Sequence, residues 1–205
     1  MTNLAIHGGP KVINKTFEPY NTIGQEEKTA ALEVLDTGIL SDYLATWGDK
    51  FEGGKKVKEF EENLANYFEV EHAICVNSWT SGLVAAVGAL EIEPGDEIIV
   101  SPVTMSASAT AIIHWNAIPV FADVETDYFC IDPKSIEKNI SSRTKAIMAV
   151  DIYGQSSNMT EIIALAKKYD LKVISDSAQA PGAMYNEKFA GTLADIGGFS
   201  LNRHK

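Results

Sequence analysis

Short apolar segments alternate with helical patterns from residue 73 to residue 176, and this alternation constrains the fold more than any other feature. Strands that are apolar on both faces and alternate with helices form parallel sheets with helices on both sides. Ligands of such sheets bind at the carboxyl ends of the strands. The sequence therefore predicts an α/β protein with a parallel or mostly parallel sheet. The predicted strands are 73–76, 97–100, 119–124, 145–151 and 172–175, and the predicted helices between them are 80–90, 106–115, 133–139 and 159–169.

The first 24 residues are predicted to form an N-terminal arm, because Gly8-Gly9-Pro10 and Gly24 interrupt any regular pattern. A helix is predicted over residues 25–36, and a second helix after Gly53-Gly54. Residues 25–205 would then form one large domain. The second helix is indicated by four apolar residues at helical spacing, Val57, Phe60, Leu64 and Phe68.

Charge and motif spacing exclude several classes of protein. The formal net charge of −11 argues against a nucleic-acid or anionic-membrane surface, both of which need clustered lysine and arginine. We see no signal peptide and no apolar run that could span a bilayer. No two histidines have metal-ligand spacing, so no metal site is predicted. Cys75 and Cys130 lack paired-ligand spacing and are predicted to be buried thiols in a reducing compartment, so a cytoplasmic protein is expected.

Three residues near the end of the chain predict a site for pyridoxal 5'-phosphate (PLP). Asp176 follows an apolar strand, Ser200 ends a later segment, and Lys205 stands five residues beyond that serine. A carboxylate can pair with the pyridine nitrogen, a hydroxyl can hold the phosphate, and an amine can form the Schiff base. Each residue alone has an ordinary structural explanation, such as a turn, a cap or a solvated surface position. The joint spacing favours the cofactor site.

At these residues the chain resembles the DegT/DnrJ/StrS sugar aminotransferases, which are PLP enzymes of fold type I. The resemblance covers essentially the whole chain and is most specific between Asp176 and Lys205. It implies a large domain with a seven-stranded, mostly parallel sheet covered by helices on both faces, and a homodimer with shared active sites. It also implies transfer of an amino group from glutamate or glutamine to a ketone on a nucleotide-linked sugar or a keto-cyclitol. The other matching segments are Gly8-Gly9-Pro10, Asn77-Ser78-Trp79-Thr80-Ser81, Pro94-Gly95-Asp96 and Tyr153-Gly154-Gln155.

The resemblance also implies individual roles. Lys205 is similar to the Schiff-base lysine, which would also move a proton as a neutral amine, and Asp176 to the acid that faces the pyridine nitrogen. Gln179 would meet the phenolic oxygen of the cofactor. The residues implied for the phosphate are Ser200, Trp79 and Thr80, and those implied near cofactor or substrate are Asn202 and His204.

Two positions depart from the family pattern. Met105 stands where the family commonly has an aromatic ring stacked on the pyridine, so a softer thioether contact is expected there. Pro181 stands where a histidine is frequent, which indicates a different acceptor.

Two alternatives remain beside the aminotransferase, and a dinucleotide-binding domain is set aside. A PLP-dependent sugar dehydratase of the same family typically has histidine in place of the lysine, so Lys205 argues against it. A non-catalytic regulatory protein with the same fold is disfavoured by Asp176, Ser200 and Lys205 together. A dinucleotide-binding domain lacks its G-x-G-x-x-G motif after the first strand. The protein is expected to continue past Lys205 with a further strand and a smaller C-terminal domain, because an exposed sheet edge needs cover.

Overall fold

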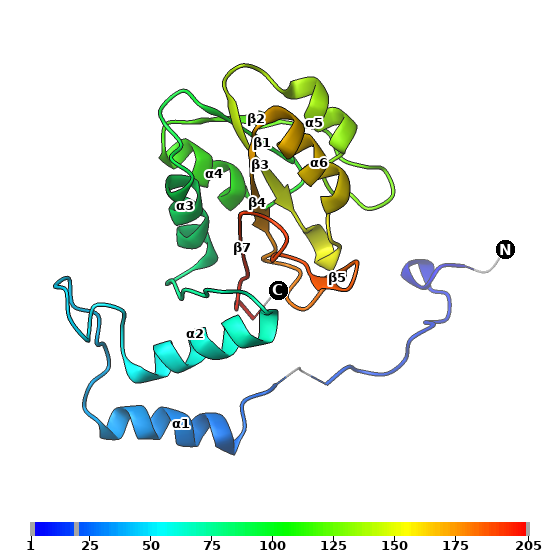
Figure 1. Cartoon of the computed structure of the whole chain (residues 1–205). Helices are drawn as coiled ribbons and strands as arrows, with labels where there is room; N and C mark the ends of the chain where they lie inside the picture. The colour runs from blue at the N-terminus through cyan, green and yellow to red at the C-terminus, as the bar shows by residue number, and fades with distance from the viewer. Residues whose placement is uncertain (1–2, 19–20, 204–205) are drawn as a thin grey trace. The chain divides into compact units, whose positions relative to one another are not determined.

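The computed structural model describes residues 3–18 and 21–203 (Figure 1). Its contacts divide the chain into two compact units, Met1–Lys55 and Lys56–Lys205. The described part of the first unit contains a short 3-10 helix, η1 (Ala5–His7), and α1 (Gln25–Asp36). The predicted helix over residues 25–36 is therefore confirmed. The sequence-based boundary after residue 24 stays a prediction.

Local polar contacts define the elements of the first unit. α1 begins where the backbone N–H of Gly24 donates to the Glu27 carboxylate at 2.6 Å, which satisfies one of the free donors at the helix start. Farther along, Lys50 and Asp42 form an ion pair at 2.8 Å. Gly53 has a φ of +89°, and a Cβ there would lie 2.6 Å from the Tyr43 ring, so only glycine fits.

The second unit is built on a five-stranded sheet with strand order β2-β1-β3-β4-β7. All four pairings between neighbouring strands are parallel, which confirms the predicted parallel sheet. Asp176, the last residue of β4, pairs with Val150 of β3 and Gly198 of β7. The carboxyl ends of these three strands therefore meet at one edge. The strands are β1 (Glu97–Val100), β2 (Ile118–Phe121), β3 (Thr144–Val150), β4 (Lys172–Asp176) and β7 (Ile196–Gly198).

Helices cover both faces of the sheet, as predicted (Figure 1). On one face, α3 (Trp79–Ala89) and α4 (Ser106–His114) pack on a core that includes Ile98, Met148 and Ile174. On the other, α5 (Pro133–Asn139) and α6 (Met159–Tyr169) pack on a core that includes Ile99, Ile147 and Val173. Successive residues of each central strand thus enter opposite cores, as the alternation of side chains along a strand requires.

The second predicted helix is also present, as α2 (Lys55–Phe68). At its C-terminal end the Phe68 ring stacks on Phe199 with centroids 4.4 Å apart and meets Phe189 edge-on at 5.1 Å. Phe189 belongs to a hairpin that the sequence analysis did not predict, formed by β5 (Met184–Tyr185) and β6 (Lys188–Phe189). This aromatic cluster ties α2 and the hairpin to the segment that follows β7.

One strand prediction was wrong. Residues 73–76 form no strand, because no described segment pairs with them, and the backbone N–H of Cys75 instead donates to the Glu61 carboxylate at 2.6 Å. The sheet within residues 3–18 and 21–203 has five strands, and residues 73–76 do not join it. The seven strands that the resemblance implies refer to the complete large domain. Cys75 is also only partly buried, whereas Cys130 is buried as predicted; burial raises the pKa of both thiols.

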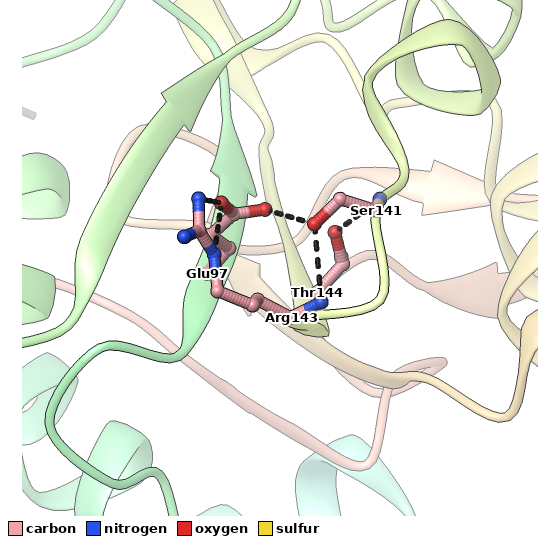
Figure 2. Close-up of polar contacts among 4 residues, drawn as sticks. All are labelled: Glu97, Ser141, Arg143 and Thr144. Carbon is pink, nitrogen blue, oxygen red and sulfur yellow. Dashed lines mark hydrogen bonds and ion pairs between the residues drawn. The ribbon is translucent and has the colours of Figure 1, made fainter.

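A polar cluster fixes the opposite, amino-terminal edge of the sheet (Figure 2). The buried Glu97 carboxylate at the start of β1 accepts from the Ser141 hydroxyl at 2.5 Å and from Arg143 Nε at 2.9 Å. These contacts lower the pKa of Glu97, with the Ser141 hydrogen bond first and that of Arg143 next. The backbone N–H of Ser141 in turn donates to the Thr144 hydroxyl at 2.9 Å, so the loop before β3 is fastened to β1.

Candidate active site

Asp176 is the centre of the candidate site. It ends β4 with only 5% of its surface exposed, although it carries an ionisable carboxyl. Its Oδ1 accepts from the Trp79 indole Nε1 at 2.7 Å, and its Oδ2 accepts from the Ser108 hydroxyl at 2.7 Å. The backbone N–H of Ala178 also donates to Oδ1, at 3.3 Å. Because an indole N–H can only donate, the contact with Trp79 requires that Asp176 Oδ1 be the acceptor.

The Trp79 indole is held in place by two glycines. A Cβ at Gly82 would lie 2.4 Å from the ring, and a Cβ at Gly198 would lie 2.1 Å from it. The ring therefore packs directly on the backbone of α3 and of β7. Trp79 begins α3, and the N-cap residue Ser78 accepts a hydrogen bond from the backbone N–H of Ser81 at 3.2 Å. The start of α3 thus places the Trp79 indole next to the end of β4.

Ser108 is held from its own helix. It is fully buried in α4, and its hydroxyl lies 2.8 Å from the hydroxyl of Thr104. Since Ser108 gives its single proton to Asp176, Thr104 must be the donor in the second contact. The result is a chain of hydrogen bonds from Thr104 through Ser108 to the carboxylate.

Gln179 lies three residues after Asp176 and is oriented by the loop that follows β3. The backbone N–H of Tyr153 donates to Gln179 Oε1 at 2.9 Å. An N–H group needs an acceptor, so the amide oxygen must face Tyr153, and Nε2 keeps two protons to donate. Tyr153 adopts a left-handed backbone, with φ of 56°, which costs free energy and is common at functional sites.

The remaining predicted residues occupy the edges of this region. Thr80 is exposed in the first turn of α3, and Met105 is 59% exposed at the N-cap of α4. Ser200 is partly buried two residues after β7, and its hydroxyl accepts from the backbone N–H of Asn202 at 3.2 Å. Lys205 and His204 lie outside the described residues.

A family model decides the affiliation. The model described as the DegT/DnrJ/EryC1/StrS aminotransferase family matches residues 26–205. The chain belongs to this family. The resemblance inferred from the sequence is therefore confirmed.

Individual relatives agree with this assignment. The chain is 46% identical over 148 residues to the dTDP-3-amino-3,6-dideoxy-alpha-D-galactopyranose transaminase of Aneurinibacillus thermoaerophilus, covering 72% of this chain and 41% of that protein. It is 33% identical over 203 residues to the L-glutamine:2-deoxy-scyllo-inosose aminotransferase of Streptomyces paromomycinus, covering 99% and 47%. The PLP form of Spr1654 from Streptococcus pneumoniae superposes with a TM-score of 0.82 at 31% identity, covering 94% and 50%. The chain thus spans about half the length of the relatives it matches.

The described residues of this family member fit the groups of PLP. A buried carboxylate, an amide with free donors and an exposed helix start all lie at or next to the carboxyl edge of the sheet, and these are the groups that a pyridine nitrogen, a phenolic oxygen and a phosphate require. No cluster of three or more possible metal ligands occurs among residues 3–18 and 21–203, and no described helix is long and apolar enough to cross a membrane.

Two polar residues in contact with Asp176 were not predicted from the sequence. Ser108 was hidden in a helix of small residues, although a serine at a buried helical position needs a polar partner. Asp151 follows β3 as Asp176 ends β4, so its place after an apolar strand was a signal that could have found it. For Trp79 the role at the phosphate stays a prediction, and the structure adds that its indole N–H donates to Asp176.

Proposed function

We propose that the protein is a PLP-dependent aminotransferase that moves an amino group from glutamate or glutamine to a ketone. The observation that supports this most is the buried Asp176 carboxylate, held by Trp79 and Ser108 at the carboxyl end of β4. A buried carboxylate in a polar setting at the carboxyl end of a parallel strand is typical of a functional site. The names of the relatives support the acceptor class, a nucleotide-linked sugar or a keto-cyclitol.

The cofactor would be held by residues from separate elements. Asp176 would pair with the pyridine nitrogen, and Gln179 Nε2 would donate to the phenolic oxygen. The first turn of α3 would bind the phosphate through Thr80 and the backbone of Trp79, together with the Ser200 hydroxyl. Met105 would lie against one face of the ring, Asn202 near its edge, and Lys205 would hold the cofactor covalently.

When bound, PLP supplies an electron sink next to the amine that is transferred. The negative charge of Asp176 would favour a proton on the pyridine nitrogen, which would strengthen electron withdrawal. A carboxylate stabilises such a neighbouring cation by about 1–3 pKa units, at about 1.4 kcal/mol each. Lys205 Nζ would move a proton between the donor α-carbon and the cofactor, which requires a neutral amine.

Trapping the attached cofactor tests the assignment of Lys205. The purified full-length protein is incubated with PLP, reduced with borohydride and mapped by peptide mass spectrometry. We expect the label on Lys205 and its loss in Lys205→Ala. A label on Lys172 or Lys188 would contradict the assignment.

The reaction itself is tested with glutamate or glutamine and a panel of keto-sugars and keto-cyclitols. Mass spectrometry should detect an amine product with one of these acceptors. A dehydrated sugar without amine would indicate the dehydratase, and no turnover with any acceptor would favour a regulatory protein.

We also propose a cytoplasmic homodimer. Cys75 and Cys130 are free thiols, which is typical of a reducing compartment. α1 buries none of its residues, and two of its leucines, Leu32 and Leu35, are 55% and 57% exposed. Apolar side chains at such a spacing on one helix are typical of a surface that a partner covers.

A further inference from the structure

A second buried carboxylate lies directly beside the first. Asp151 follows β3, and its side chain is 1% exposed. The preceding residue, Val150, pairs with Asp176, and the backbone N–H of Asp151 donates to the backbone oxygen of Asp176 at 3.0 Å. The proposed reaction assigns no role to Asp151, yet its backbone touches the residue on which that reaction depends.

The Asp151 carboxylate binds the two residues that flank Asp176. Its Oδ2 accepts from the Ser177 hydroxyl at 2.5 Å and from the Ser175 hydroxyl at 3.2 Å. Its Oδ1 accepts from the backbone N–H of Ser157 at 2.8 Å. The pKa of the Asp151 carboxyl is raised, because burial outweighs the hydrogen bonds, led by that of Ser177, which act to lower it.

The two carboxylates act on opposite faces of β4. Side chains alternate along a strand, so Asp176 shares its face with Ile174, and Ser175 shares the other with Val173. Ile174 belongs to the core under α3 and α4, where Trp79 and Ser108 hold Asp176. Val173 belongs to the core under α5 and α6. The end of β4 is therefore held on one face by hydrogen bonds to Asp176. On the other face it is held by hydrogen bonds from Ser175 and Ser177 to Asp151.

We propose that Asp151 is a positioning residue that fixes the end of β4, so that Asp176 is held at the place where it meets the pyridine nitrogen of PLP. This inference rests on the proposed function. Neither Trp79 nor Ser108 holds the residues beside Asp176, whereas the Asp151 carboxylate accepts hydrogen bonds from both adjacent serines. Without the Asp151 carboxylate, Asp176 would keep Trp79 and Ser108, but the two serines beside it would lose their shared acceptor.

The test compares Asp151→Asn with Asp195→Asn. Asp195 is a matched control, since its carboxylate also binds β4, accepting from the backbone N–H of Val173 at 2.8 Å, but near the start of the strand. In the full-length protein we expect both variants to unfold at lower denaturant concentration. Only Asp151→Asn should raise the dissociation constant for PLP, by about 10- to 100-fold, the range found for outer-shell residues of metal sites. It should also alter the absorbance spectrum of the bound cofactor.

Ser177→Ala is a second, milder variant in case Asp151→Asn does not fold. It removes the shortest of the hydroxyl contacts and leaves the carboxylate in place. We expect weaker PLP binding, and the double variant should lose less than the sum of the two single losses. Equal PLP affinities and spectra in wild type, Asp151→Asn and Ser177→Ala would overturn the inference. If the wild-type protein itself binds no PLP, the proposed function fails instead.

Discussion

At the scale of single residues, the site depends on partners that fix the atoms of one carboxylate. Asp176 has two oxygens, and each accepts a hydrogen bond from a different helix. The indole N–H of Trp79 sits on a rigid ring, while the Ser108 hydroxyl can rotate. Removing the charge of Asp176 should mainly affect turnover, whereas removing the Ser108 donor should mainly affect stability and PLP binding.

Replacing Asp176 with asparagine keeps the volume of the side chain and removes its charge. We expect turnover to fall about 10- to 1000-fold, because about 1.5–4 kcal/mol of stabilisation of the protonated pyridine is lost. Part of the PLP binding should remain, since the residues proposed to hold the phosphate are untouched. Steady-state kinetics and the cofactor spectrum measure this, and near-wild-type turnover with an unshifted spectrum would mean that another group faces the nitrogen.

Replacing Ser108 with alanine removes one donor from Asp176 and leaves Thr104 without its acceptor. A buried polar group that loses its partner costs about 1–3 kcal/mol, so we expect a lower free energy of unfolding and weaker PLP binding. Ser106→Ala is the control, because Ser106 lies exposed on the same helix. Denaturant unfolding and PLP titration of both variants provide the comparison. Identical behaviour of the two would show that the Ser108 contact is dispensable.

At the scale of elements, the two edges of the sheet have separate tasks. The carboxyl edge gathers Asp176, Trp79 and Gln179, whereas the amino edge is closed by Glu97 with Ser141 and Arg143 (Figure 2). A polar cluster far from the site can stabilise the fold without touching the reaction. Stability and activity should therefore separate in variants of the two edges.

The Glu97 cluster at the amino edge should make the free energy of unfolding depend on pH. The folded state lowers the pKa of Glu97, so its stabilising effect is complete above the unfolded value of about 4.3 and disappears as the pH falls through the lower folded value. Glu97→Gln should cost about 1–3 kcal/mol at pH 7 and progressively less below pH 4. Urea unfolding of wild type and variant across this range measures the difference, with the exposed Glu93→Gln as control. A difference that does not change with pH would contradict the assignment.

At the scale of the whole molecule, the proposed homodimer is the feature to test. Leu32→Asp/Leu35→Asp places two charges on the exposed apolar stripe of α1 and should convert a dimer into monomers, since charges are disfavoured in the centre of an interface. Ala30→Asp puts the same kind of charge on the opposite face of the helix and should leave the mass unchanged. Light scattering after gel filtration of the full-length protein distinguishes these outcomes. A monomeric wild type would contradict the dimer.

The sequence by itself determined the class of fold, the parallel sheet and most element boundaries. The helices 25–36, 133–139 and 159–169 have the predicted bounds, because capping residues and apolar periodicity are local properties. It also selected Asp176, because its spacing from Ser200 and Lys205 matches the groups that PLP requires. The family match confirms the resemblance drawn from these residues, while the individual site roles, Lys205 above all, stay predictions.

Only the tertiary structure decided which distant residues meet. The contact between Trp79 and Asp176 joins positions 97 residues apart, and that between Ser108 and Asp176 joins positions 68 apart. No local pattern encodes such pairs, because they depend on how α3 and α4 pack on the sheet. Residues 73–76 show the same limit in reverse: their composition favours a strand, but a strand forms only where a neighbour supplies the hydrogen bonds.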